Sequence, residues 1–286
     1  MVAEVLAHLA PERRGMFVDC TVGLGGHARA ILERGATRLL GLDRDRSALA
    51  YARVALAAYA DRVELVHSDY RDLEAVLDAR GLSTVDGILA DLGVSSLQLD
   101  AEGRGFTFRR DEPLDMRMDQ SAGPTAADSL REVDEKTLAD VIYEFGEERH
   151  SRRIARAIVA ARTERPIETT GQLADIVRRA VPRTGYARID PATRTFQAIR
   201  IWVNRELDRL DAFLSGAARR LAAGGRLVVI AFHSLEDRIV KHTFRALQAD
   251  GIVAIRTRRP MVPTEAEIER NPRSRSAKLR AVERAA

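Results

Sequence analysis

Short apolar runs alternate with amphipathic stretches along the first hundred residues. The segments between the runs, such as 28–34 and 47–58, carry apolar residues at spacings of three and four and contain no internal glycine or proline, which is typical of helices. The apolar runs predict buried strands at 16–21, 38–43, 63–67 and 86–92. Strands that alternate with helices predict an α/β fold with a mostly parallel sheet.

This alternation stops after residue 92 and resumes near residue 195. No strand is predicted between 101 and 193, where turn signals separate three expected helices at 136–144, 151–162 and 170–180. Beyond this stretch we expect, in chain order, a long helix at 195–222 that stops at Gly224 and Gly225, a strand at 226–232, a helix at 235–247 and strands near 251–256 and 278–282. The pattern predicts a Rossmann-like domain formed by 1–100 and 195–286, with an all-helical domain inserted at 101–194.

The composition is that of a globular protein. The chain has 286 residues, of which 45% are apolar and 31% charged, and no apolar run approaches the roughly 20 residues of a membrane span. Its single cysteine, Cys20, cannot form an internal disulfide, and no basic and then apolar leader opens the chain. We therefore expect a cytoplasmic protein without membrane contact.

The charge is unevenly distributed. Residues 1–100 carry 11 basic and 15 acidic side chains, whereas residues 195–286 carry 18 basic and 10 acidic ones. A basic last third favours a phosphate-rich partner, because each Lys or Arg near a phosphate releases counterions. Only three of the 46 basic residues are lysines, however, and so general an arginine bias also arises from composition alone. Charge by itself leaves nucleic-acid binding open.

In an open α/β sheet, ligands bind beyond the carboxyl ends of the strands. The first strand is followed by a glycine-rich turn at 19–27, in which glycine lets the backbone approach a ligand closely. The dinucleotide fingerprint G-x-G-x-x-G fails, because its third glycine is Ala28. Asp43 lies 20 residues beyond Gly23 at the end of the second strand, where a carboxylate can accept both hydrogen bonds of a ribose diol. Its alternative roles are those of a helix cap or a partner for a nearby arginine.

Polar residues also follow the third and fourth strands. The segment 67–70 ends in Tyr70 and suits an adenine, with a helix cap by Asp69 as the alternative. Asp91 ends the fourth strand, where an acid faces the reacting end of a cofactor.

At these residues a resemblance becomes specific. The chain carries, in order, the glycine turn, Asp43, D-L-G-V-S-S at 91–96 with Gln98, R-G-F at 104–106, P-L-D-M-R-M-D at 113–119, G-E-E-R at 146–149, T-R-T-F-Q-A at 193–198, R-I-W-V-N at 200–204 and F-H-S-L-E-D-R at 232–238. This series resembles the bacterial 16S ribosomal RNA cytosine-N4 methyltransferase family along nearly the whole chain. Two departures are Leu97, where the family usually has proline, and Tyr70, where it often has phenylalanine. The start of the chain and the region 249–273 are also shorter than in the family.

The resemblance implies a class I methyltransferase with S-adenosylmethionine as cofactor. Its acceptor would be the exocyclic amine of one cytidine in the decoding region of 16S rRNA, within the small ribosomal subunit. The family's cofactor contacts fall on Gly25, Gly26 and His27 at the methionine end, on Asp43 at the ribose, on Tyr70 near the adenine, and on Asp91 and Gln98 toward the sulfonium.

The reaction itself limits the catalytic candidates. A cytosine amine is a poor nucleophile because its lone pair is delocalised into the ring, so an enzyme must position it and accept its N–H hydrogens. Asp91 is the first candidate acceptor, with Asp115 and His233 as further ones. Asp115 could instead belong to a surface ion-pair ladder, and His233 precedes Ser234 and Asp237, which resemble a capping box. No covalent nucleophile is needed.

The RNA must be held while the target base is extruded, and we expect the base to lie between the strand ends and the helical domain. The first candidates for binding the RNA backbone are Arg270, Arg273, Arg275, Lys278 and Arg280, and the second are Arg152, Arg153 and Arg156.

No metal site is expected, because the histidines lack partners at ligand spacing. Three rival functions are an NAD-dependent oxidoreductase, a non-enzymatic ribosome-assembly factor and an amino-methyltransferase acting on DNA. The oligomeric state stays open.

Overall fold

The computed structural model describes residues 1–182 and 190–286. The chain forms two compact units. The sheet unit comprises Met1–Gly93 and Leu207–Ala286, and the helical unit comprises Val94–Glu206. The predicted limits of the insertion, 101 and 194, were therefore wrong at both ends, because flanking residues pack with the helices and not with the sheet.

The sheet unit contains a seven-stranded, mostly parallel sheet in the order β3-β2-β1-β4-β5-β7-β6. The first five strands are parallel, and β7 lies antiparallel between β5 and β6. The strands are β1 (Met16–Asp19), β2 (Arg38–Asp43), β3 (Val63–His67), β4 (Val85–Asp91), β5 (Leu221–Ala231), β6 (Val253–Ile255) and β7 (Lys278–Arg284). Each predicted strand is present, and those at 38–43 and 63–67 have the expected bounds.

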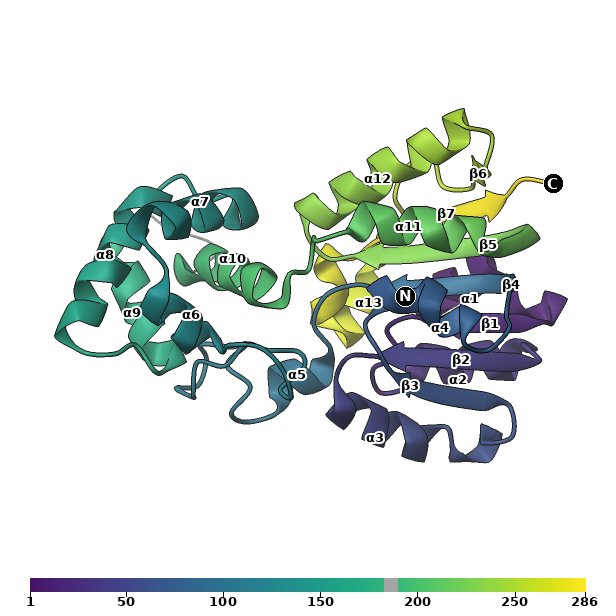
Figure 1. The fold of residues 1–286 in the computed structure, drawn as a ribbon, viewed down its shortest axis with the longest axis horizontal. Helices are drawn as coiled ribbons and strands as arrows, with labels where there is room; N and C mark the ends of the chain where they lie inside the picture. The colour runs from purple at the N-terminus through teal and green to yellow at the C-terminus, as the bar shows by residue number, and fades with distance from the viewer. Residues whose placement is uncertain (183–189) are drawn as a thin grey trace. The chain divides into compact units, whose positions relative to one another are not determined.

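Helices cover both faces of this sheet (Figure 1). Because successive strand residues point to opposite faces, Phe17 and Leu39 pack with one helical layer, and Val18 and Leu40 pack with the other. The first layer contains α1 (Val2–Leu9), α2 (Gly26–Arg34) and α3 (Arg46–Ala55). The second contains α4 (Leu73–Asp78), α11 (Leu210–Arg219) and α12 (Ser234–Ala249). The shorter elements of the unit are η1 (Pro11–Arg13), η2 (Ala57–Tyr59), η3 (Tyr70–Asp72), α13 (Glu265–Arg270) and η4 (Pro272–Ser276).

The long helix expected at 195–222 is two helices. The chain leaves α10 (Ala192–Asn204) through Arg205 and enters α11 after Arg209, and both of these residues have positive φ, at 51° and 57°. Asn204 anchors the end of α10, since its side chain accepts from Met118 N and donates to Met116 O, each at 2.7 Å. Apolar periodicity continues across the break because each helix buries a face in the core of its own unit.

The glycine pair at 224 and 225 lies inside β5 and does not end a helix. Gly224 has a φ of 74°, and the pairing of β4 with β5 shifts register between Val85 and Gly87. These features are those of a β-bulge, for which glycine is well suited. The prediction failed because a helix stop and a bulge both favour glycine.

The helical unit has one apolar core, to which Leu138, Ile142, Ile154, Leu173 and Phe196 contribute. Its helices are α5 (Ser96–Asp100), α6 (Ala126–Glu132), α7 (Glu135–Gly146), α8 (Ser151–Glu164), α9 (Thr170–Ala180) and α10. Within the described part of this unit no strand occurs, only an isolated bridge between Pro113 and Thr169. No helix in the described ranges is long and apolar enough to cross a membrane.

Candidate active site

The carboxyl ends of β1 and β4 meet at the switch point of the sheet. The chain passes from β1 to β2 on one side and later returns to β4 on the other, so the connections diverge between these two neighbours. Ligands of open α/β sheets bind in the crevice that such a divergence creates. Asp19 ends β1 and Asp91 ends β4, and Asp91 N donates to Thr21 Oγ1 at 2.7 Å, which joins the two strand ends.

The glycine turn leaves room for a ligand. Gly23 and Gly25 have φ of 52° and 86°, in the region that favours glycine. A Cβ on Gly25 would come 3.3 Å from Leu56 Cγ, whereas a Cβ on Gly26 would meet nothing within 4 Å. Gly26 begins α2, whose N-cap is Gly25 and receives no side-chain cap. Open space thus lies beside Gly26 at the start of a helix, a place where ligands that accept hydrogen bonds commonly bind.

Asp43 supports this turn from the end of β2. Its Oδ2 accepts from Gly23 N and its Oδ1 from Asp45 N, both at 2.8 Å. Burial raises the pKa of Asp43, and the two backbone bonds oppose that effect. Each carboxylate oxygen can accept a second hydrogen bond, so the predicted ribose contact remains compatible with this geometry. The supporting role in the turn was not predicted from sequence.

Asp19 is a candidate site residue that the sequence analysis missed. Its side chain is buried, Oδ1 accepts from Thr21 N at 3.1 Å, and Oδ2 has no hydrogen-bond partner among residues 1–182 and 190–286. Burial raises the pKa of Asp19 to about 7, attraction to His27 and the bond from Thr21 oppose this, and repulsion from Asp91 and Asp43 adds to it. The available signal was its place as the last residue of a strand, which it shares with Asp43 and Asp91.

His27 and Asp91 form the centre of the cluster. His27 Nε2 lies 3.5 Å from Asp91 Oδ2. Burial acts to lower the pKa of His27, but its interactions with Asp91 and Asp19 raise the pKa above its usual value. His27 Nδ1 and Asp91 Oδ1 are buried and find no hydrogen-bond partner in the described structure. The structure therefore brings together two predicted residues, with polar atoms available for a ligand.

The protonation of Asp19 predicts a pH dependence of stability. Since its pKa is higher in the folded chain than in the unfolded chain, folding binds a proton between about pH 4 and 7. The free energy of unfolding of the ligand-free protein therefore falls as pH rises through this window, by on the order of 4 kcal/mol from this group. Asp19→Asn should remove that contribution. Urea unfolding of both proteins from about pH 4 to 8 measures it, and a pH-independent difference would contradict the assignment.

Cys20 lies in the sheet core, not in the crevice. It is buried and its backbone N–H donates to Leu89 O. Burial raises the pKa of the Cys20 thiol well above its ordinary value, and the Asp19 carboxyl adds to this shift. Because the thiolate is the nucleophilic form, Cys20 is poorly suited to covalent catalysis.

Tyr70 begins η3 and packs against Phe213, with ring centroids 4.7 Å apart. Asp69 caps this short helix by accepting from Arg71 N, and its carboxylate also pairs with Arg71 and Arg44. The capping alternative for Asp69 is thus confirmed, while the adenine contact of Tyr70 stays a prediction.

Two predicted residues belong to the helical unit. Gln98 forms a capping box with Ser95, since Gln98 Oε1 accepts from Ser95 N at 3.0 Å and Ser95 Oγ accepts from Gln98 N. Asp115 binds Arg117 through both oxygens and also accepts from Gln120 Nε2. Burial alone would raise the pKa of Asp115, but these bonds lower it. The geometry favours the ion-pair alternative for Asp115 over a proton acceptor.

His233 is the N-cap of α12, so the capping box begins one residue earlier than predicted. His233 Nδ1 accepts from Glu236 N, and Glu236 Oε2 accepts from His233 N, each at 3.4 Å. Glu236 Oε2 also accepts from Phe232 N at 2.9 Å. The alignment of Ser234 with Asp237 was wrong because a histidine can cap with its ring nitrogen. A catalytic role for His233 stays a prediction.

Three members of the C-terminal basic cluster make ion pairs with acidic residues. Arg280 is only 8% exposed, and its Nε lies 2.6 Å from Asp237 Oδ1. Lys278 pairs with the other oxygen of Asp237 at 3.3 Å, and Arg270 pairs with Glu267. Three of the five cations thus share two carboxylates, and contact of this cluster with RNA stays a prediction.

The second group of arginines expected to bind the RNA backbone lies on α8 in the helical unit. Arg152 and Arg153 are exposed, whereas Arg156 lies 3.6 Å from Glu135. Contact of these arginines with RNA stays a prediction.

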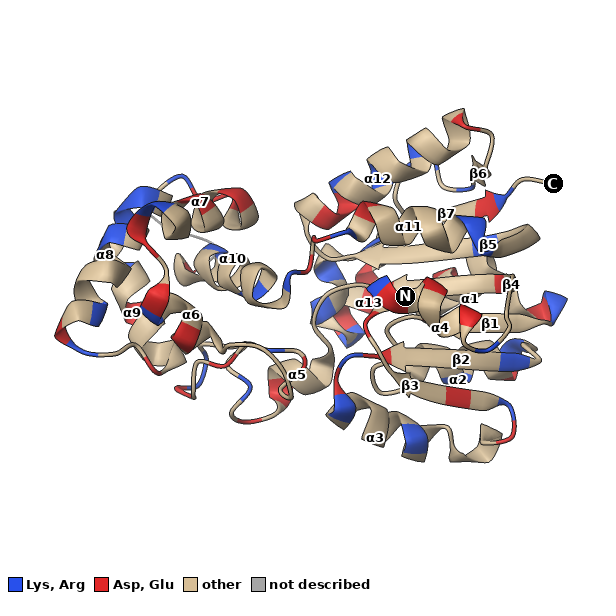
Figure 2. Ribbon diagram, viewed as in Figure 1, with Lys and Arg blue, Asp and Glu red and all other residues tan. Residues whose placement is uncertain are grey.

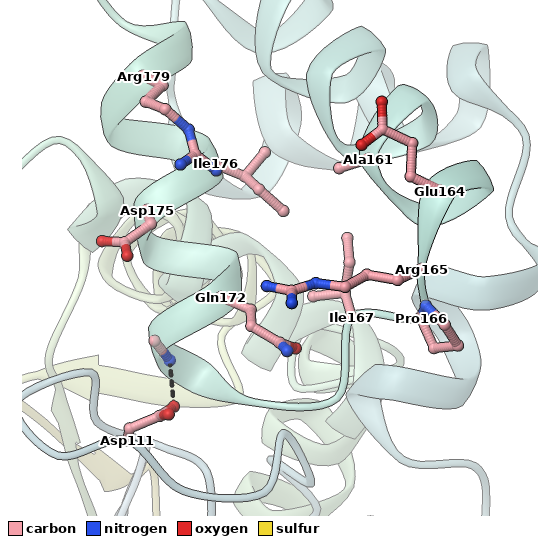
Figure 3. Close-up of a pocket in the computed structure, with 11 residues that line it drawn as sticks. Asp111, Ala161, Glu164, Arg165, Pro166, Ile167, Gln172, Asp175, Ile176 and Arg179 are labelled. Carbon is pink, nitrogen blue, oxygen red and sulfur yellow. Dashed lines mark hydrogen bonds between the residues drawn. The ribbon is translucent and has the colours of Figure 1, made fainter.

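A separate hollow of about 760 Å³ lies within the helical unit (Figure 3). Arg165 and Arg179 point toward it, and Ile167 and Ile176 form an apolar part of its lining. Asp111 lies at its edge and accepts from Gly171 N at 2.8 Å. None of the predicted site residues lines this hollow.

Comparison with known proteins places these features in a family. A model of the MraW methylase family matches residues 1–285. The chain belongs to this family. It is 53% identical to the ribosomal RNA small subunit methyltransferase H of Deinococcus radiodurans, over 100% of this chain and 89% of that protein. The protein of the same name from Bradyrhizobium diazoefficiens is 52% identical over 98% of this chain and 89% of its own. The protein of the same name from Geotalea uraniireducens is 50% identical over 99% of this chain and 97% of its own length.

Membership of the family confirms the resemblance seen in the sequence. The observed sheet also confirms the predicted fold class, a Rossmann-like methyltransferase domain that carries a helical insertion.

Proposed function

We propose that this chain is an S-adenosylmethionine-dependent methyltransferase that methylates the exocyclic N4 amine of a cytidine in the decoding region of 16S rRNA. The observation that carries the proposal is the His27–Asp91 pair beside the glycine turn, in a chain of the MraW methylase family. Its relatives are named for ribosomal RNA small subunit methylation. The small ribosomal subunit is the proposed partner, and the cytoplasm, where ribosomes are assembled, the proposed compartment.

The residues at the strand ends fit this cofactor. Asp19 Oδ2 is a buried acceptor without a partner in the described structure, which suits an ammonium group such as that of the methionine end. Open space beside Gly26 admits the backbone of such a ligand. Asp43 has acceptor capacity for a ribose diol. When bound, S-adenosylmethionine supplies an electrophilic methyl group on its sulfonium.

Asp91 is the proposed acceptor for the cytosine amine. A carboxylate oxygen that accepts one N–H hydrogen increases the electron density on the nitrogen, and Asp91 Oδ1 lacks any other partner in the described ranges. His27, 3.5 Å from Oδ2, orients the carboxylate. After methyl transfer the nitrogen is cationic, so its proton passes readily to Asp91. Holding the amine in line for attack supplies on the order of 7 to 11 kcal/mol of the barrier reduction.

The proposal is tested with the purified protein, S-adenosylmethionine and small ribosomal subunits from a strain that lacks the gene. Mass spectrometry of the RNA nucleosides should then detect N4-methylcytidine, which should be absent when the protein is omitted. Methylation at carbon 5, or methylation of DNA only, would contradict it. No single turnover despite cofactor binding would favour the assembly-factor alternative, and calorimetric binding of NADH in place of S-adenosylmethionine would favour the oxidoreductase.

A variant of Cys20 tests the absence of a covalent step. Carbon-5 methylation of cytosine requires an attacking thiol, whereas amine methylation does not. Cys20→Ser should therefore keep a near-normal single-turnover rate on small subunits, even though its buried hydroxyl lowers stability. A variant that remains folded by circular dichroism but has no activity would restore a covalent mechanism.

A further inference from the structure

The outer face of α12 carries a row of basic side chains. Arg238, Lys241, His242 and Arg245 follow one another at helical spacing and therefore share one face. The opposite face, which includes Val240, Phe244 and Leu247, is buried in the sheet-unit core. No acidic residue occurs from 238 to 249, so no i, i+4 pair within this stretch reduces the charge.

The acidic residues at the start of α12 already have other partners. Glu236 is buried and accepts from the backbone at the start of α12, and Asp237 is held by Lys278 and Arg280. Lys241 and Arg245 make no ion pair in the part of the chain that the structure describes. We call the face formed by Arg238, Lys241, His242 and Arg245 the α12 basic face.

Several other basic side chains of the sheet unit make ion pairs. On α2, Arg29 pairs with Glu33 at 2.7 Å and Arg34 with Glu12 at 3.6 Å. Near α4, Arg80 pairs with Glu64 and Arg220 with Asp78. The α12 basic face differs from these helices, because Lys241 and Arg245 have no acidic partner in the described structure and lie on one face of one helix.

We propose that the α12 basic face binds the phosphodiester backbone of the RNA substrate. This inference rests on the proposed function. Arg238 and Arg245 are separated by about 10.5 Å along the helix axis, so the face suits a string of phosphates better than one small anion. Helix α12 begins just beyond the carboxyl end of β5, the edge of the sheet at which Asp91 ends β4. Figure 2 shows the basic positions along this helix.

The test uses the double variant Lys241→Gln with Arg245→Gln. Binding of unmethylated small ribosomal subunits is measured by filter retention over a range of salt concentrations. Affinity should fall about 10- to 100-fold at 0.1 M salt, and the slope of log K against log salt should flatten by about 1.4 to 1.8, or 0.7 to 0.9 per lost phosphate contact. Calorimetric affinity for S-adenosylmethionine should not change, because neither residue belongs to the strand-end site.

Two matched variants control for charge and for folding. Arg29→Gln with Arg34→Gln removes the same charge from α2, on the other face of the sheet, and should leave the slope unchanged. Lys241→Arg with Arg245→Lys keeps the charge and should retain the wild-type slope.

An unchanged slope in the glutamine variant would overturn the inference, as would an equal effect of the α2 variant. Loss of binding to phosphatidylserine vesicles, with RNA binding intact, would assign the face to a membrane and also overturn it. If wild-type protein binds subunits but methylates none, the proposed function fails separately.

Discussion

Asp91→Asn is expected to slow methyl transfer by about 100-fold or more while changing cofactor affinity less. The substitution keeps the shape of the side chain, but an amide is a weaker hydrogen-bond acceptor than a carboxylate, so it loses stabilisation that develops mainly in the transition state. The backbone of Asp91 is held independently, because its N–H donates to Thr21 Oγ1. The fold should therefore survive, and the single-turnover rate on small subunits is the diagnostic measurement.

The same substitution at the other end of β4 provides the control. Asp86 Oδ2 accepts from Met16 N at 2.7 Å, far along the strand from the carboxyl edge. Asp86→Asn should lower stability and leave the rate near that of the wild type. If Asp91→Asn stays within threefold of the wild-type rate, Asp91 is not an important acceptor.

The loss of His27 should slow methyl transfer less than the loss of Asp91, because His27 acts by orienting the carboxylate.

Parts of this site were predictable from the sequence. Asp43 and Asp91 end strands with clear apolar patterns, so their positions at one sheet edge followed from strand assignment. The role of His27 came from the family resemblance, and the structure places it beside Asp91. Asp19 follows the same rule but was hidden within the glycine turn. Its burial depends on the packing of β1 between β2 and β4, which local pattern does not contain.

Prediction failed where one local pattern is compatible with two arrangements. An apolar face with helical spacing ran through 195–222, yet α10 and α11 bury their faces in different cores. Charge was misread for a similar reason. Arg280 and Lys278 are far from Asp237 in the sequence, so only the pairing of β7 beside β5 and its packing with α12 showed that both cations pair with this carboxylate.

Asp43→Ala is expected to have the second large effect, a weaker affinity for S-adenosylmethionine. Each charge-assisted bond lost to the ribose diol should cost about 1.5 to 3 kcal/mol, roughly tenfold or more in Kd. The structure adds a second cause, because Gly23 N and Asp45 N would lose their acceptor and the glycine turn its support. Titration calorimetry on protein that is folded by circular dichroism measures the change.

Two further variants separate these causes. Asp43→Asn retains an acceptor oxygen for the turn but lacks the charge, so its affinity should lie between those of the wild type and Asp43→Ala. Asp45→Ala removes the cap of α3, which accepts from Ser47 N and Ala48 N, and should lower stability by about 0.5 to 2 kcal/mol without a comparable loss of affinity. Wild-type affinity in Asp43→Ala would remove Asp43 from the cofactor site. An equal loss in Asp45→Ala would show that the effect arises from stability of the α3 end and not from the ribose contact.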